Sequence, residues 1–275
     1  MTSPAAWLRE HGLAPKKRLG QNFLLDEHAC ARIAEAATTP AGGTVLEIGP
    51  GLGALTVPLL QRADRVVALE RDEELIPLLE ERAAGVGSLR VLSGDALEAD
   101  WALLLDGPRP HTIAGNLPYF ITGRLLERSI ELASRIDRAV FMVQAEVADR
   151  LLAAPGTKTY GALSVFTRAA FEVSRLLTLK GGAFYPRPEV SSSVVVLVPR
   201  NPPVTEETPA FRALVKGAFG MRRKTLRNAW KGVLQWSAEE LAANAAKASI
   251  HLDARGETLS PEDFARIAAL ADRPD

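Results

Sequence analysis

The chain has 275 residues, of which 47% are hydrophobic and 24% are charged. This composition is typical of a globular protein that is long enough for one α/β domain and a smaller second domain. Its 33 basic and 33 acidic residues cancel. The balance argues against a protein that binds polyanions through its overall charge, so any contact with nucleic acid needs a local basic patch.

Cysteine content and hydropathy restrict the compartment. Cys30 is the one cysteine, so no intramolecular disulfide can form, and a reducing environment is expected. The first residues lack the basic segment and apolar run of a secretion signal. No apolar stretch approaches the length that crosses a bilayer. A cytoplasmic enzyme is therefore expected.

Short β-rich runs alternate with amphipathic helical runs over the first two thirds of the chain. Strands are predicted at Thr44–Gly49, Arg65–Glu70, Leu89–Asp95, His111–Asn116 and Arg138–Gln144. Helices with apolar residues at three- and four-residue spacing are predicted at Leu52–Gln61, Glu73–Ala84 and Thr122–Ala133. This alternation predicts an α/β fold with a parallel, doubly wound sheet. Two later runs, Glu172–Leu179 and Ser192–Val198, predict a hairpin added to that sheet.

A change of character at Pro199 predicts a domain boundary. Pro199–Pro203 reads as a stiff linker, because proline fixes its own φ angle and lacks a backbone donor. The remaining sequence is predicted to be helical at Pro209–Phe219, Lys224–Trp230, Ala238–Ala248 and Pro261–Ala271. We therefore predict one domain over residues 1–199 and a small helical domain over residues 200–275.

A glycine-rich segment, Glu47-Ile48-Gly49-Pro50-Gly51-Leu52-Gly53, follows the first predicted strand and leads into a helix. Glycines at Gly49 and Gly51 allow a tight turn and a close approach of the backbone to a ligand. Alone, the motif also fits the dinucleotide fingerprint, or a strand-to-helix turn that binds nothing.

Acidic residues close the next two predicted strands. Glu70 can accept hydrogen bonds from both ribose hydroxyls of a nucleoside, although a solvated carboxylate is an equal alternative. In Gly94-Asp95-Ala96-Leu97, Asp95 can accept from the amino group of an adenine ring. Open α/β sheets bind ligands at the carboxyl ends of their strands. These positions favour NAD or S-adenosylmethionine as the ligand.

The fourth predicted strand ends in Asn116-Leu117-Pro118-Tyr119, the most specific signal of the sequence. An exocyclic amine is a poor nucleophile because its lone pair is delocalised into the purine ring. The Asn116 side-chain oxygen and the Pro118 carbonyl can each accept one N–H of that amine and aim its lone pair at a methyl group. Tyr119 can stack on the base, which must leave any helix. The alternative is an asparagine turn beside a core tyrosine.

Basic and aromatic segments indicate contacts with RNA. The run Lys16–Leu24 places cations beside amides and apolar residues, and phosphate contact or a solvated turn would each explain it. A stretch without acidic residues contains Lys216, Arg222, Arg223, Lys224, Arg227 and Lys231. Trp230 and Trp236 are expected to be core residues. The histidines His11, His28, His111 and His251 show no metal-ligand spacing, so no metal is predicted.

Taken together, these motifs resemble the small-subunit rRNA adenine N6,N6-dimethyltransferases, the KsgA type. The resemblance rests on Glu-Ile-Gly-Pro-Gly-Leu-Gly, Glu70, Gly-Asp-Ala and Asn-Leu-Pro-Tyr. It extends to the segments 19–24, Phe184–Pro188 and Phe219–Asn228, and so covers nearly the whole chain. One departure is Ser191-Ser192-Ser193, where we expect an aspartate soon after the Phe-x-Pro-x-Pro-x-Val run.

The resemblance implies a seven-stranded, Rossmann-like class I methyltransferase sheet with a helical C-terminal domain. It implies dimethylation of two adjacent adenines in a hairpin loop near the 3′ end of small-subunit rRNA. Apart from the resemblance, we expect a monomer whose partner is small-subunit rRNA or the immature small subunit. S-adenosylmethionine is the implied cofactor, held by Asn22, Leu24, Gly49, Glu70, Asp95 and Asn116, and the neighbouring motif positions Gly51 and Ala96 join this predicted set. Asn116 and Pro118 would hold the amine, with Tyr119 and Phe184 on either side of the base.

Other functions remain open at this stage. The sister enzymes that methylate large-subunit rRNA share most of the N-terminal motifs, and DNA adenine is a further possible substrate. An NAD-dependent oxidoreductase leaves Asn116–Tyr119 unexplained. A factor that mainly binds immature subunits, with methylation as a release step, is the non-enzymatic alternative.

Overall fold

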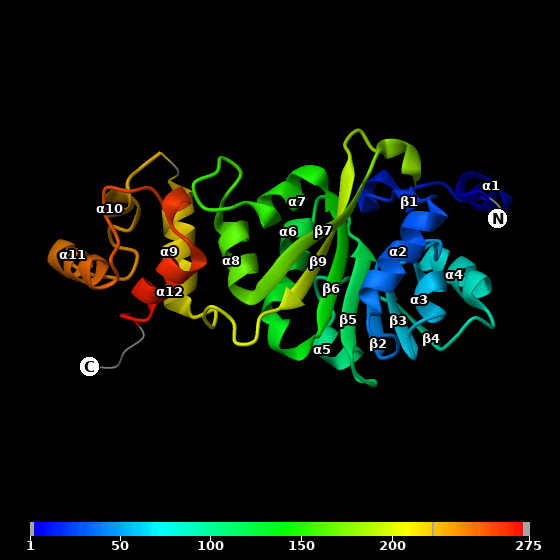
Figure 1. Ribbon diagram of the computed structural model, residues 1–275. Helices are drawn as coiled ribbons and strands as arrows, with labels where there is room; N and C mark the ends of the chain where they lie inside the picture. Colours follow the sequence, from blue (N-terminus) through cyan, green and yellow to red (C-terminus); the bar gives the residue numbers. More distant parts are fainter. Residues whose placement is uncertain (1–2, 222, 272–275) are drawn as a thin grey trace. The chain divides into compact units, whose positions relative to one another are not determined.

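The computed structural model describes residues 3–221 and 223–271. The chain divides into two compact units (Figure 1). The first unit comprises the residues up to Ala148 together with Ser174–Pro199, and the second comprises Asp149–Val173 together with the residues from Arg200 onward. The predicted boundary at residue 199 differs from this division in one respect. Residues 149–173 belong with the C-terminal helices, because helix α8 (Ala162–Ala170) packs against α9 (Pro209–Gly220) and α12 (Pro261–Ala268).

In the described part of the chain, seven strands form one mixed sheet in the order β4-β3-β2-β5-β6-β9-β7 (Figure 1). Neighbouring pairs among β2 to β6 are parallel, and β9 lies antiparallel to β6. The predicted fold class is thereby confirmed. The strands are β2 (Thr44–Ile48), β3 (Arg65–Glu70), β4 (Leu89–Ser93), β5 (His111–Asn116), β6 (Arg138–Gln144), β7 (Phe171–Leu179) and β9 (Ser192–Pro199).

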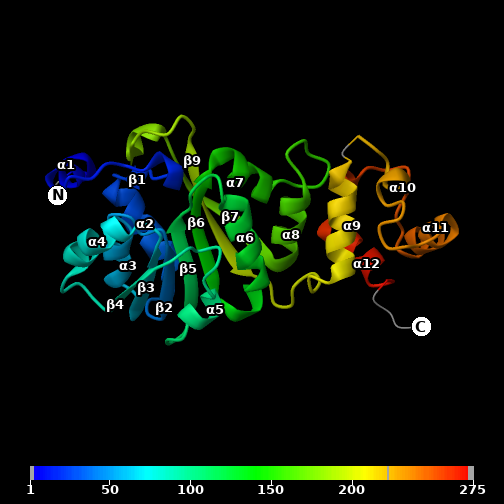
Figure 2. The same ribbon diagram turned by 180° about the vertical axis from the view of Figure 1, so that it is seen from behind.

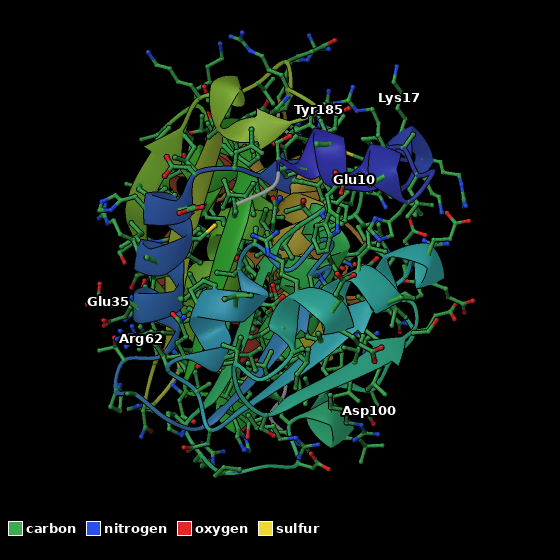
Figure 3. The ribbon with its side chains drawn as sticks, turned by 90° about the vertical axis from the view of Figure 1, so that its right-hand side faces the viewer. Glu10, Lys17, Glu35, Arg62, Asp100 and Tyr185 are labelled. Atoms are coloured by element: carbon green, nitrogen blue, oxygen red, sulfur yellow. The ribbon has the colours of Figure 1, made fainter. Side chains whose placement is uncertain are left out.

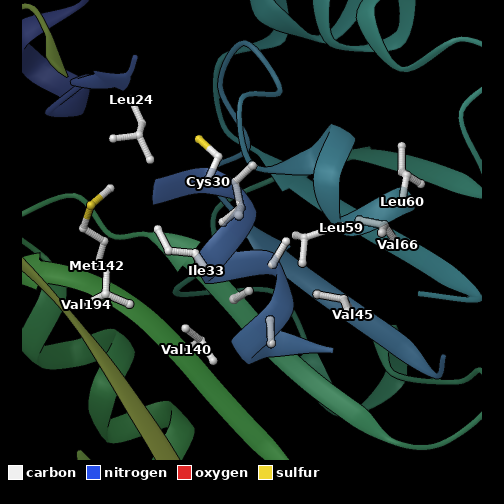
Figure 4. Packing of buried hydrophobic residues seen from close by; sticks show 14 of the residues in the cluster. Leu24, Cys30, Ile33, Val45, Leu59, Leu60, Val66, Val140, Met142 and Val194 are labelled. Atoms are coloured by element: carbon white, nitrogen blue, oxygen red, sulfur yellow. The ribbon is translucent and has the colours of Figure 1, made fainter. Parts of the chain in front are cut away.

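Helices cover both faces of this sheet (Figures 1 and 2). On one face, α2 (Glu27–Ala37) and α3 (Thr56–Leu60) pack on strand residues such as Val45 and Val140 (Figure 4). Asp26 begins α2 by accepting a hydrogen bond from the Ala29 backbone N–H, as N-cap residues do. The remaining helices of this unit are α1 (Pro4–Glu10), α4 (Ile76–Ala83), α5 (Trp101–Leu104), α6 (Thr122–Glu131) and the start of α7 (Ala145–Leu152).

A two-stranded sheet joins the N-terminal segment to the loop before β9. Strand β1 (Phe23–Leu24) pairs antiparallel with β8 (Phe184–Tyr185), with Phe23 opposite Tyr185 and Leu24 opposite Phe184. A short 3₁₀ turn, η1 (Lys17–Leu19), precedes β1. The small sheet therefore holds residues 16–24 beside the carboxyl ends of the main strands, where several of them line a pocket.

The C-terminal unit has an aromatic core. Tyr160, fully buried, donates its hydroxyl hydrogen to the Leu259 carbonyl (2.9 Å) and packs edge-on against Phe219. Trp230 is buried as predicted, and its indole N–H donates to the Leu214 carbonyl (2.8 Å). Besides α8 and α9, the unit contains α10 (Leu226–Ala229), α11 (Ala238–Lys247) and α12. Of the predicted basic stretch, Arg222 lies outside the described residues.

Some helix ends follow from local signals. Ser260 caps α12, where its hydroxyl accepts from the Asp263 N–H and the Asp263 carboxylate accepts from the Ser260 N–H. This reciprocal pair places the helix start at Pro261, as predicted. None of the described helices has the length and apolarity needed to span a membrane.

Candidate active site

A pocket opens at the carboxyl ends of β2, β3, β4 and β5. The empty space between and in front of its walls, open solvent included, is about 1170 Å³. Such a position is where open α/β sheets bind their ligands. The structure brings to its wall every residue predicted to contact the cofactor, namely Asn22, Leu24, Gly49, Gly51, Glu70, Asp95, Ala96 and Asn116.

The glycine-rich segment forms the turn after β2. Gly49 and Gly51 have φ angles of 64° and 55°, in the left-handed region that favours glycine. A Cβ at Gly51 would also lie 3.1 Å from the Phe23 ring, which is tighter than ordinary contact. The turn therefore brings bare backbone to the pocket wall, and the Gly51 N–H donates to Glu70 Oε2 (3.0 Å).

Glu70, at the end of β3, is 6% exposed and held in one orientation. Its Oε2 accepts from Gly51, and its Oε1 accepts from the Asp72 backbone N–H (2.8 Å). Burial raises the pKa of the Glu70 carboxyl, and these backbone hydrogen bonds partly offset the rise. Each carboxylate oxygen can accept a further hydrogen bond, so Glu70 can receive a pair of donors from a ligand in the pocket.

Asp95 follows β4 and is fixed on both sides. Its Oδ1 accepts from the Leu97 N–H (2.8 Å), while its Oδ2 pairs with the half-exposed Arg71 guanidinium (3.2 Å). These two contacts fix the orientation of the Asp95 carboxylate where it lines the pocket. This is the position in which Asp95 is predicted to accept a hydrogen bond from an adenine amino group.

Glu47, which the sequence analysis did not assign to the site, also lines the pocket. It is 1% exposed, and burial raises the pKa of its carboxyl to about 8. Within the described residues, its buried Oε2 has no hydrogen-bond partner. The sequence did contain a signal for this role, because Glu47 is an acidic residue in the glycine-rich motif and lies near the carboxyl end of β2.

The N-terminal segment is tied to the β3 end of the pocket. Lys16 Nζ lies 2.6 Å from Asp72 Oδ1 and 2.6 Å from Glu74 Oε2. Gln21 Nε2 donates to Asp72 Oδ2 (2.7 Å), and Gln21 Oε1 accepts from the Lys16 backbone N–H (2.7 Å). Of the basic run, Lys16 is therefore neutralised inside the protein, while Lys17 (Figure 3) and Arg18 are exposed.

The same segment orients Asn116. Asn116 Nδ2 donates to the Asn22 carbonyl (2.8 Å), which leaves the side-chain Oδ1 as an acceptor at the pocket wall. The Pro118 carbonyl already accepts from the Ile121 N–H (3.2 Å) and from Thr122 Oγ1 (3.0 Å). Among the described residues, no donor is hydrogen-bonded to the Leu117 carbonyl.

The two aromatic residues predicted to enclose the base do not line this pocket. Tyr119 is half-buried, and its hydroxyl lies 2.8 Å from Ser192 Oγ. Burial raises the pKa of the Tyr119 phenol. Phe184 is 3% exposed and packs in the cluster that contains Leu24. The aromatic side chain of this loop that does line the pocket is Phe120.

Comparison with known proteins gives consistent matches. The family model of ribosomal RNA adenine dimethylase matches residues 12–273. The "Ribosomal RNA small subunit methyltransferase A" of Moorella thermoacetica is 44% identical over 273 residues, which is 96% of this chain and 94% of that protein. The protein of the same name from Geobacter metallireducens is 42% identical over 95% of this chain and 97% of its own.

Solved structures agree in fold. The crystal structure of a dimethyladenosine transferase from Plasmodium falciparum superposes with a TM-score of 0.78 at 25% identity, over 89% of this chain and 95% of that chain. The 23S rRNA methyltransferase ErmE superposes with a TM-score of 0.69 at 29% identity, over 92% and 100% of the two chains. Within the part of the chain that the structure describes, no group of His, Cys, Asp and Glu could hold a metal ion.

Proposed function

The chain belongs to the ribosomal RNA adenine dimethylase family, and from this we propose its reaction and substrate. The protein transfers methyl groups from S-adenosylmethionine to the N6 amines of two adjacent adenines in a hairpin loop near the 3′ end of small-subunit rRNA. The observation that carries this proposal is Asn116, which ends β5 at the pocket wall with its amide donor engaged and its oxygen available.

The pocket fits a donor-rich nucleoside such as S-adenosylmethionine. That molecule offers an adenine amine, two ribose hydroxyls and an ammonium group, all of them hydrogen-bond donors. The wall offers acceptors at successive strand ends, namely Glu47, Glu70 and Asp95. The buried Oε2 of Glu47 has no hydrogen-bond partner in the described residues, and a polar group of a bound ligand would satisfy it. This agreement between the wall and the ligand supports the predicted cofactor.

We assign the ligand contacts by position. Glu70 accepts from the ribose hydroxyls, and Asp95 accepts from the adenine amine. Asn22, Leu24, Gly49, Gly51 and Ala96 shape the walls with backbone and apolar atoms. When bound, the cofactor supplies an electrophilic methyl group on a sulfonium, so most of the protein's contribution is positioning.

Asn116 activates the target amine. Its Oδ1 accepts one N–H of the amine, which favours a tetrahedral nitrogen whose lone pair can point at the methyl group. The orientation of Oδ1 is set by the hydrogen bond from Nδ2 to the Asn22 carbonyl. Because Asn22 itself lines the pocket, the segment that surrounds the cofactor also orients the catalytic amide.

The second acceptor for the amine comes from the same loop. The predicted acceptor, the Pro118 carbonyl, has both lone pairs engaged by Ile121 and Thr122, so one of those bonds must open for it to serve. The preceding carbonyl, of Leu117, accepts no hydrogen bond within the described residues and is the competing candidate. A Thr122→Val variant frees one lone pair of Pro118. Faster turnover would favour Pro118, and unchanged turnover would favour Leu117.

Tyr119 and Phe184 remain proposed contacts of the target base. Tyr119 is half-buried and can present a ring face from the catalytic loop. Phe184 is almost fully buried, so its contact with the base requires β8 to shift away from Leu24. Phe184→Leu therefore separates the roles, because a packing role tolerates leucine and a stacking role does not.

The decisive test is methyl transfer from radiolabelled S-adenosylmethionine to small ribosomal subunits that lack this modification, followed by nucleoside analysis. Formation of N6,N6-dimethyladenosine supports the proposal. Label that enters only large-subunit RNA or DNA would move the protein to a sister activity, which the likeness to ErmE makes a specific alternative. Cofactor binding without label on any nucleic acid would refute it.

Replacing Asn116 tests the catalytic step. Asn116→Ala removes an interaction that is made mainly in the transition state, so turnover should fall more than cofactor affinity. Asn116→Asp retains an oxygen acceptor and serves as the partial control. If Asn116→Ala turns over as fast as the unchanged protein, the assigned role is wrong.

The proposed partner is the immature small ribosomal subunit, bound by a monomer in the cytoplasm. Growth and subunit maturation with the Asn116→Ala protein would distinguish catalysis from a binding role. Normal assembly without methylation would favour the assembly-factor alternative.

A further inference from the structure

Phe120 occupies an unusual position for an aromatic side chain. It is 60% exposed, and within the described residues every other Phe, Tyr and Trp is buried or half-buried. Burying such a ring would stabilise the protein by about 1.5–3 kcal/mol. No residue of its own unit provides that burial, so the exposed ring face is available to a ligand.

The ring stands at the rim of the pocket. Phe120 lines the pocket and belongs to the loop that carries Asn116 and Pro118. The ring packs closely against Gly20, where an added Cβ would lie 3.1 Å from Phe120 Cε1. The exposed aromatic surface is thus held between the catalytic loop and the N-terminal segment.

Unpaired cations belong to the two segments that meet at this ring. Lys17 and Arg18 lie three and two residues before Gly20, and Arg124 lies four residues after Phe120, in α6. All three are exposed, and among the described residues none of their side chains forms a hydrogen bond or ion pair. Their neighbour Lys16, in contrast, is held by Asp72 and Glu74.

We propose that Phe120 stacks on the nucleobase that flanks the target adenine, while Lys17, Arg18 and Arg124 contact the adjoining phosphates. Aromatic faces beside cations bind single-stranded nucleic acid in this manner. The target amine must reach Asn116 Oδ1 in the pocket wall, whereas Phe120 lies four residues further along the loop and keeps 60% of its surface exposed where it lines the pocket. The ring is therefore placed for the neighbouring base. This inference rests on the proposed function and adds a residue to its substrate site.

The test is equilibrium binding of a hairpin RNA whose loop carries two adjacent adenines, in the presence of S-adenosylhomocysteine so that no transfer occurs. Phe120→Ala should weaken RNA binding about 5- to 150-fold, the range for loss of one base–aromatic stack. Phe120→Trp should retain binding. Affinity for S-adenosylhomocysteine alone is measured for each variant, and RNA binding is compared at saturating S-adenosylhomocysteine, so that lost stacking is separated from a changed pocket.

Leu103→Ala is the matched control, because Leu103 is a large apolar residue that is 70% exposed on α5 and does not line the pocket. A fluorescent 2-aminopurine at the flanking position should be quenched by the unchanged protein and less so by Phe120→Ala. Replacing Lys17 and Arg18 with glutamine should lower the salt dependence of binding by about 0.7 per lost phosphate contact.

The outcomes separate this inference from the proposed function. If the unchanged protein methylates small-subunit RNA but Phe120→Ala binds the hairpin as Leu103→Ala does, the Phe120 assignment is wrong and the reaction stands. Quenching at the target position instead of the flanking one would also overturn it. If the unchanged protein neither binds nor methylates adenine-containing RNA, both fail.

Discussion

Asp72 connects the N-terminal segment to the pocket, and replacing it should loosen that segment. Its carboxylate is 4% exposed and receives hydrogen bonds from Lys16 Nζ (2.6 Å) and Gln21 Nε2 (2.7 Å). Its backbone N–H, which orients Glu70, would survive a change of side chain. Asp72→Asn therefore weakens the attachment of residues 16–22 while it leaves the carboxylate of Glu70 in place.

The magnitude follows from the bonds that change. A hydrogen bond to a charged group contributes about 1.5–3 kcal/mol, against about 1 kcal/mol for a neutral one. Asparagine keeps one neutral bond and loses the charge that Lys16 pairs with. A net loss of about 2 kcal/mol shifts the opening equilibrium of the segment about 30-fold. Glu74, the other partner of Lys16, is 57% exposed, so Glu74→Gln should cost at most about 1 kcal/mol.

Hydrogen exchange measures this equilibrium directly, because local opening sets the exchange rate of protected amides. The Gly20 N–H, bonded to the Lys17 carbonyl (3.0 Å), should exchange about 30-fold faster in Asp72→Asn. It should exchange at most about fivefold faster in Glu74→Gln. Affinity for S-adenosylhomocysteine should fall in the same order. If residues 16–22 exchange at the unchanged rate in folded Asp72→Asn, the reasoning about this contact is refuted.

Two buried groups yield further predictions. Because burial raises the pKa of the Glu47 carboxyl from its ordinary value of 4.5 to about 8, the folded state keeps a proton that the unfolded state releases. The free energy of unfolding should therefore fall as pH rises from about 4.5 to about 8. Urea unfolding across this range should show a smaller fall for Glu47→Gln than for the unchanged protein. Equal falls in the two proteins would contradict the raised pKa of Glu47. Cys30 is 4% exposed, and burial raises the pKa of its thiol to about 12. A disulfide reagent near pH 8 should therefore label Cys30 only after the protein unfolds. Rapid labelling of the native protein would contradict the burial of this thiol.

The strands could be predicted because their signal is local. The runs His111–Asn116 and Arg138–Gln144 have the bounds that the sequence predicts, and their central residues are buried on both faces, as in a strand that is covered on both sides. The helix predicted from Leu52 begins only at Thr56, because Gly51 and Gly53 adopt positive φ angles and the chain is still turning there. Strands β1 and β8 have two residues each, too few for any periodicity.

The position of the pocket could be predicted for a related reason. Parallel strands end at one edge, so motifs at successive strand ends converge without any knowledge of loop structure. What the sequence could not give was the pairing of groups that are distant along the chain. The run Lys16–Arg18 looks uniform, yet Lys16 pairs with Asp72, 56 residues away, while Lys17 and Arg18 face solvent.

Phe120 lines the pocket and Tyr119 does not, and the hydroxyl of Tyr119 explains the difference. A half-buried hydroxyl needs a polar partner, and Tyr119 finds one in Ser192 Oγ on β9 (2.8 Å). Phe120 has no polar atom to satisfy and takes the position at the rim. The serine run stands where an aspartate is expected, and its hydroxyls form hydrogen bonds. Ser192 Oγ bonds Tyr119, and Ser193 Oγ lies 3.0 Å from Thr178 Oγ1. Ser192→Ala should free the Tyr119 ring to reorient, because its hydroxyl loses the partner that holds it between the catalytic loop and β9.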